Sequence, residues 1–179
     1  MEPFPLQKAF TFTESGPVLL MTTASGKKRD VMTLTWHMVV DFSPRLAITT
    51  GPWNFSWYLL KESRECVFAV PPALWVKKAI AIGMTTGETE DKFARFGLRT
   101  QQGRSVKAPL LADCIGCIEC RVVQFLESGI ILLQGEQAWV NPEEKDSPRI
   151  HAVGDGRFIT DGETADYRDL MAAKLPEGV

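Results

Sequence analysis

The sequence predicts a mainly β fold, a small Greek-key β-barrel with a few short helices around it. The segments between turn signals are short and rich in Val, Ile, Thr, Phe and Trp, a composition typical of strands. Most of them follow one another through turns rather than through crossover helices, so antiparallel pairing is expected. Antiparallel strands closed around one core, with helices at the ends, give such a barrel.

Six main strands follow from this pattern. They are expected at residues 18–23, 31–40, 46–50, 66–70, 115–126 and 130–140, with two further extended segments at 106–111 and 149–153. Polar residues 25–30 separate the first two strands, and residues 127–129 separate the two longest. Such short turns predict two antiparallel hairpins.

Four helices are expected, at residues 54–63, 73–82, 89–96 and 164–175. Asn54 is a suitable N-cap for the first, while Gly83 and Gly97 follow the ends of the second and third. The apolar side of the second helix is predicted to consist of Leu74, Val76, Ile80 and Ile82, and that of the last of Tyr167, Leu170 and Met171.

Composition excludes several classes of function. The chain has 179 residues with a formal charge of −2, so it has no surplus of positive charge for binding nucleic acid. No apolar run approaches the length needed to span a membrane. The first residues, MEPFPLQKAF, lack the basic start and apolar stretch of a secretory signal, so a cytoplasmic location is expected.

Cys114, Cys117 and Cys120 stand at the spacing of metal ligands, but the sequence favours buried, reduced thiols. The run continues into a strand, where residues three apart face opposite sides, so Cys117 would point away from the other two. A structural zinc site needs four converging ligands. We therefore expect no metal, and we expect Cys66 to be reduced as well.

The strand at 31–40 carries the first candidate site. Regular alternation would put Thr33, Thr35 and His37 on one face, and Met32, Leu34, Trp36 and Met38 on the other. Two hydroxyls and an imidazole can contact a polar ligand closely. Threonine is also a good strand former, so a purely structural face fits the same pattern.

A second candidate lies where the strand at 46–50 leads into the helix at 54–63. Thr50, Asn54 and Ser56 could serve a phosphate at the start of this helix, where backbone N–H groups are free. Asn54 could equally act only as the helix cap. Lys92 stands in the first turns of another helix, where a phosphate would account for a cation, and pairing with Glu88 or Glu90 is the alternative.

The chain has no glycine-rich dinucleotide or P-loop motif, and no Ser/His/Asp arrangement stands out. The sequence therefore assigns no catalytic residue. Chemistry supplied by a bound cofactor is the better hypothesis.

Taken in order, several short motifs resemble the flavin reductase-like and flavoredoxin-like FMN-binding split-barrel family. They are PVLLMTT at 17–23, MTLTW at 32–36, CVFAVP at 66–71, Gly87 with DKF at 91–93, Gly97-Leu98, and IECRVV at 118–123 followed by Gly135-Glu136. The resemblance covers about residues 16–140. It leaves an N-terminal arm (1–15) and a C-terminal extension (about 141–179) around a single FMN-binding domain.

The resemblance implies a six-stranded Greek-key split β-barrel and a homodimer with one FMN per subunit near the interface. Residues 33–37, that is Thr33, Leu34, Thr35, Trp36 and His37, would line the isoalloxazine and ribityl region. Thr50, Asn54 and Ser56 would serve the phosphate end, and Lys92 would approach the phosphate charge. Trp36, with its opposite parity, also suits packing or a dimer surface.

Two positions depart from the family. Asp30 stands where relatives often have Asn, and an acid is unfavourable close to an anionic flavin. Ile130 stands where many reductases carry a histidine that is thought to help at the nicotinamide. The second departure bears on turnover with NAD(P)H and leaves FMN binding untouched.

The leading hypothesis is a flavin reductase-like oxidoreductase that passes electrons through bound FMN, with NAD(P)H as a possible co-substrate. One alternative is a flavoredoxin-like electron carrier reduced by a redox partner protein. Another is a non-catalytic flavin or small-ligand binding module, because a fold does not fix a function.

Overall fold

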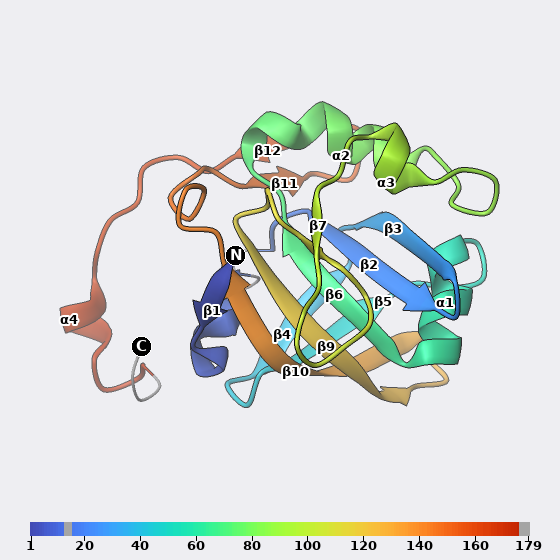
Figure 1. Ribbon diagram of the computed structural model, residues 1–179. Helices are drawn as coiled ribbons and strands as arrows, with labels where there is room; N and C mark the ends of the chain where they lie inside the picture. Colours follow the sequence, from blue (N-terminus) through green and yellow to red (C-terminus); the bar gives the residue numbers. More distant parts are fainter. Residues whose placement is uncertain (13–15, 176–179) are drawn as a thin grey trace.

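The computed structural model, which describes residues 1–12 and 16–175, contains an eight-stranded antiparallel sheet that curls into a barrel (Figure 1). The strands follow the order β3 (Lys28–Leu34), β2 (Leu19–Ser25), β6 (Glu65–Val70), β9 (Gly116–Phe125), β10 (Ile130–Val140), β5 (Arg45–Thr49) and β4 (His37–Asp41), and β1 (Glu2–Phe4) also pairs with β10. Both expected hairpins, β2–β3 and β9–β10, are present. The predicted fold class is confirmed.

The strand predicted at 31–40 is broken into two, β3 and β4. Leu34 pairs with Leu19 of β2, whereas His37 pairs with Ile48 of β5. Because β3 and β4 are the two ends of the sheet, residues 35–36 join these ends and make the sheet close on itself. A straight strand could not pair with both β2 and β5, so the chain bends at this corner.

The bend reverses which side chains face the core. Met32 and Leu34 are buried before it, but Trp36 and Met38 are 67% and 59% exposed after it. The prediction that these four residues share one face is therefore wrong. The shared face predicted for Thr33, Thr35 and His37 is wrong for the same reason, because alternation holds only within an unbroken strand.

Strands β2 and β6 are buried on both faces. Leu19, Met21 and Phe68 point into the barrel, while Leu20 and Val67 pack outside it. The outer layer also contains Ala79 and Ile82 of α2 (Val76–Gly83) and Phe93 of α3 (Lys92–Arg95), and both helices lie over this part of the sheet in Figure 1. This layer fixes the helices relative to β3.

Helix α1 (Phe55–Ser63) lies where it was predicted, whereas the last two helices are shorter than predicted. The helix expected at 73–82 is a 3-10 turn, η2 (Ala73–Trp75), followed by α2, and it buries Ala79 and Ile82 while Leu74 and Ile80 are exposed. The helix expected at 89–96 begins only after Asp91, whose carboxylate accepts from the N–H groups of Phe93 and Ala94. The last helix is reduced to α4 (Arg168–Met171), whose expected apolar side, Tyr167, Leu170 and Met171, is exposed.

The segments outside the barrel hold short elements. The N-terminal arm contains β1 and a 3-10 helix, η1 (Leu6–Phe12). Of the expected segment 106–111 only β8 (Leu110–Leu111) is a strand, paired with β7 (Thr100–Gln101). The segment at 149–153 forms β11 (Ile150–Ala152), which pairs with β12 (Phe158–Thr160). In the described part of the chain, no helix is long and apolar enough to span a membrane.

The cysteines are free and buried, as predicted, but their arrangement differs. Cys114 precedes β9 in a turn and packs in the same outer layer as Cys117, so the prediction that these two face apart is wrong. Cys120 points into the barrel, opposite Cys66. Among the residues described, no three His, Cys, Asp or Glu side chains are grouped as a metal site requires.

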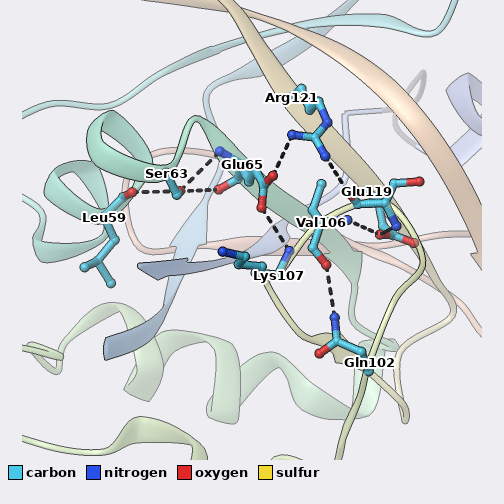
Figure 2. A network of polar contacts seen from close by, with 9 residues as sticks. Leu59, Ser63, Glu65, Gln102, Val106, Lys107, Glu119 and Arg121 are labelled. Atoms are coloured by element: carbon cyan, nitrogen blue, oxygen red, sulfur yellow. Dashed lines mark hydrogen bonds and ion pairs between the residues drawn. The ribbon is translucent and has the colours of Figure 1, made fainter. Parts of the chain in front are cut away.

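Two carboxylates hold the loop between β7 and β8 against the sheet, as Figure 2 shows. Glu119 of β9 is fully buried and accepts hydrogen bonds from the backbone of Arg104, Ser105 and Val106 at 2.7–3.0 Å. Glu65 accepts from the backbone N–H of Lys107 and pairs with Arg121. The loop is thereby fixed by charge-assisted bonds rather than by a strand ladder.

Candidate functional site

A cleft of about 240 Å³ opens where β3, the start of α1 and the segment between α2 and α3 meet. Its walls come from Asp30, Met32 and Thr33, from residues 53–55 and 82–87, and from Lys92. We refer to it as the Asp30 cleft. It is the place where the outer layer of the sheet ends and polar side chains replace apolar ones.

Asp30 and Lys92 form a buried ion pair in the wall of this cleft. Lys92 Nζ lies 3.2 Å from Asp30 Oδ1, and the two side chains are 4% and 2% exposed. Ser56 Oγ donates to Asp30 Oδ2 at 2.6 Å, and Lys92 Nζ also donates to the carbonyl of Val31 at 2.7 Å. Burial lowers the pKa of Lys92, and the neighbouring Asp30 partly offsets this effect.

This pairing corrects the alternative partner expected for Lys92. Glu90 pairs with Arg95 instead, and Glu88 is exposed. Asp91 caps α3, so Lys92 is the first residue of that helix and its long side chain reaches back to β3. Sequence distance hid this partner, because Asp30 and Lys92 lie 62 positions apart on different elements.

Gly87 lets the segment after α2 lie against the carboxylate of Asp30. A Cβ atom at this position would lie 2.1 Å from Asp30 Oδ1. Since no side chain fits in that space, residue 87 has to be glycine for the cleft to keep its shape.

Asn54 does not cap α1 with its side chain. Its Nδ2 donates to Thr50 Oγ1 at 3.1 Å, and helix α1 begins without a side-chain cap. The interpretation of Asn54 as a simple cap is therefore wrong. Phe55, the first residue of α1, lines the Asp30 cleft, so the uncapped start of the helix adjoins the polar wall.

Thr33 lies in the cleft wall as well, and its hydroxyl donates to the carbonyl of Ala79 at 2.5 Å. The cleft thus joins three of the predicted site residues directly, namely Thr33, Asn54 and Lys92. Two more are connected to it by hydrogen bonds, Ser56 through Asp30 and Thr50 through Asn54.

The other predicted site residues lie elsewhere. Leu34 is part of the barrel core, and Thr35 is exposed at the corner. Trp36 and His37 line a separate, apolar depression of about 230 Å³ together with Met38, residues 47–49 and Ile130. The bend at the corner separates them from the Asp30 cleft. We refer to this second hollow as the Ile130 depression.

His37 Nε2 lies within hydrogen-bonding distance, 2.7 Å, of the carbonyl oxygen of Pro17. A carbonyl can only accept, so Nε2 carries the proton in this contact. Within the described chain, the buried Nδ1 has no hydrogen-bond partner. Burial lowers the pKa of His37, while the bond to Pro17 opposes that shift, so the neutral ring is favoured.

Reasoning from the sequence missed parts of the cleft. Trp53, Phe55 and the segment 82–86 line it but carried no signal for a ligand. Asp30 was noted only as an unfavourable acid, whereas it is the centre of the polar wall. The available hint was chemical, since an acid on a strand needs a cation when the fold buries it.

Comparison with known proteins agrees with this architecture. Residues 12–159 match the family described as flavin reductase like domain. An uncharacterized protein of Archaeoglobus fulgidus is 34% identical over 104 residues, which cover 58% of this chain and 59% of that protein.

Solved structures of other proteins share the fold. An FMN-binding domain of a flavin reductases-like enzyme from Shewanella baltica OS155 has a TM-score of 0.84 at 18% identity, covering 92% of this chain and 96% of that one. The flavoredoxin of Desulfovibrio vulgaris (Miyazaki F) has a TM-score of 0.77 at 20% identity, covering 85% and 90%. With the match over residues 12–159, this chain belongs to the flavin reductase-like domain family.

Proposed function

We propose that this protein is a flavoprotein of the oxidoreductase type that binds FMN, with the polar end of the flavin in the Asp30 cleft. The observation that carries the proposal is the convergence of donors there. Lys92 Nζ, the Asn54 amide and the uncapped start of α1 adjoin one small cleft. Such a set of hydrogen-bond donors suits the polar end of a flavin, a polyhydroxylated chain that ends in a hydroxyl or a phosphate.

The roles of individual residues follow from their contacts. Thr33 and Asn54 would hydrogen-bond the ribityl and phosphate end, while Ser56 and Thr50 hold Asp30 and Asn54 in place. Gly87 keeps space for close approach of the backbone. Bound FMN would supply the redox chemistry, and the protein would orient it and exclude water.

The electron donor is the finer question. Ile130 is 37% exposed in the Ile130 depression and cannot form a hydrogen bond, so no side-chain donor from this position is available to a nicotinamide. We therefore propose slow reduction by NAD(P)H. A redox partner protein is the second candidate donor, because Ile130 offers a nicotinamide no hydrogen bond.

We also propose a homodimer that buries the outer face of β4. Trp36, Met38, Val40 and Phe42 are each 44–67% exposed at alternate positions, next to Ile130. A row of large apolar side chains on an end strand favours a protein partner. In a symmetric dimer, the same apolar face of both subunits would pack together. The four reduced, buried thiols support a cytoplasmic location.

The proposal is tested on the purified protein. Cofactor released by heat should be yellow, fluorescent and identical to FMN by chromatography, and apoprotein should take up added FMN. Lys92→Met should lower the affinity for FMN, because it leaves the negative charge of Asp30 unpaired. Lys77→Glu, at an exposed position of α2 outside the cleft, should leave the affinity unchanged. Colourless protein that takes up no FMN would rule the proposal out.

A further inference from the structure

We infer that Asp30 sets the selectivity of the proposed flavin site and makes it nearly indifferent to the terminal phosphate. The inference rests on the proposed function and deepens it. It concerns the choice between FMN, a phosphate monoester, and riboflavin, which carries a hydroxyl at the same place. The two ligands differ in little but charge.

The geometry places a carboxylate and an ammonium together in the wall. Lys92 Nζ lies 3.2 Å from Asp30 Oδ1, and both side chains are almost completely buried. Oδ1 has no hydrogen-bond partner among the described residues, so the ion pair is the interaction that this oxygen makes. The positive charge of Lys92 is thereby neutralised by Asp30 inside the protein.

The carboxylate of Asp30 is also prevented from rotating away from Lys92. Ser56 Oγ holds Oδ2 at 2.6 Å, and the backbone at Gly87 presses against Oδ1 so closely that no Cβ fits between them. The residue comes from β3, Ser56 from α1 and Lys92 from α3, so three elements fix the arrangement. A ligand cannot release Lys92 from Asp30 without disturbing all three.

The electrostatic consequence has a definite sign. A phosphate monoester carries a charge of about −1.5 to −2 at neutral pH. An unpaired lysine in the wall would favour it strongly over a hydroxyl, because charges interact strongly at low dielectric. With Asp30 beside Lys92 the pair contributes almost no net charge, so the preference for FMN over riboflavin is small.

The test compares the affinities of FMN and riboflavin by flavin fluorescence titration. Asp30→Asn keeps the shape and leaves Lys92 unpaired, so FMN affinity should rise about tenfold or more while riboflavin affinity changes less than about threefold. Lys92→Met should lower the FMN preference. The double variant, which is neutral like the native pair, should return to the wild-type ratio.

Glu88→Gln is the matched control, since it removes an exposed negative charge outside the cleft and should leave the ratio unchanged. Circular dichroism checks that each variant is folded. If Asp30→Asn does not fold, the return of the double variant relative to Lys92→Met still decides the matter.

The inference is overturned if wild-type protein already prefers FMN over riboflavin more than about a hundredfold, or if Asp30→Asn changes both affinities equally. In either case flavin still binds and the proposed function stands. Absence of binding of both flavins to every variant would instead remove the proposed function, and this inference with it.

Discussion

The indole Nε1 of Trp139 donates a hydrogen bond of 2.7 Å to Oε1 of Glu119, a fully buried carboxylate between neighbouring strands. Three backbone N–H groups of the loop at 104–106 complete its set of donors. A carboxylate satisfied in this way anchors a loop that has little strand pairing of its own.

Glu119→Gln should therefore destabilise the fold. An amide cannot accept at both of its terminal atoms, so at least one buried N–H would lose its partner, at a cost of about 1–3 kcal/mol. Urea denaturation measures the difference. Glu136→Gln, at an exposed position of the neighbouring strand, should stay within about 0.5 kcal/mol of wild type. Equal stability of both variants would contradict the anchoring role.

Stability should decrease in acid through Asp161. Although its partial burial raises the pKa, hydrogen bonds from His151 and Arg149 outweigh this and lower it to about 2, from an ordinary value of 3.8. A carboxyl group whose pKa is lower in the folded than in the unfolded protein stabilises the fold at pH values above its unfolded pKa. This contribution is lost as the pH falls from about 4 towards 2. Unfolding free energies of wild type and Asp161→Asn should converge over that range, and parallel curves would argue against it.

The cysteines should be unreactive in the native protein. All four are buried, and burial raises the pKa of Cys114 and Cys120 and raises that of Cys117 to about 12. The thiolate is the reactive form. Ellman's reagent should therefore modify almost no thiol in native protein and four thiols in concentrated guanidinium. Rapid modification without denaturant would refute this assignment.

The outer face of β4 should hold the proposed dimer together. Sedimentation should report about twice the chain mass of 19.9 kDa. Replacing both Trp36 and Met38 by Glu should give monomers, because the two charges would be buried at the interface. Leu74→Glu is the control, since Leu74 is 93% exposed on η2 and does not belong to this face. A wild-type monomer at micromolar concentration with FMN bound would exclude the dimer.

Electron supply can be tested at Ile130. Wild-type protein loaded with FMN should be reduced slowly by NADH or NADPH and readily by dithionite, as followed by anaerobic absorption. Ile130→His adds a hydrogen-bonding group to the Ile130 depression and should accelerate reduction by NADH more than reduction by dithionite. Fast turnover of the wild type with NADH, or no gain from the substitution, would show that another group orients the nicotinamide. His37, in the same depression, is then the next residue to replace.

Local features of the chain were readable from the sequence. The hairpins around Gly26 and Gly129 were predicted because glycine permits the positive φ angles, 58° and 84°, that these turns adopt. The strands at 66–70 and 130–140 were predicted from their content of Val, Ile, Phe and Trp, and helix α1 from its apolar spacing. These signals depend on neighbouring residues only.

What the sequence by itself determined was thus the fold class, most strand positions and five residues in or next to one cleft. Only the tertiary structure decided that the strand at 31–40 bends at Thr35 and Trp36, since closure of the sheet is a property of all its strands together. The bend separates His37 from Thr33. The pairing of Lys92 with Asp30 was also decided in three dimensions. A buried charge needs an opposite charge within a few ångströms, and the fold, not the position in the sequence, determines which residue lies that close.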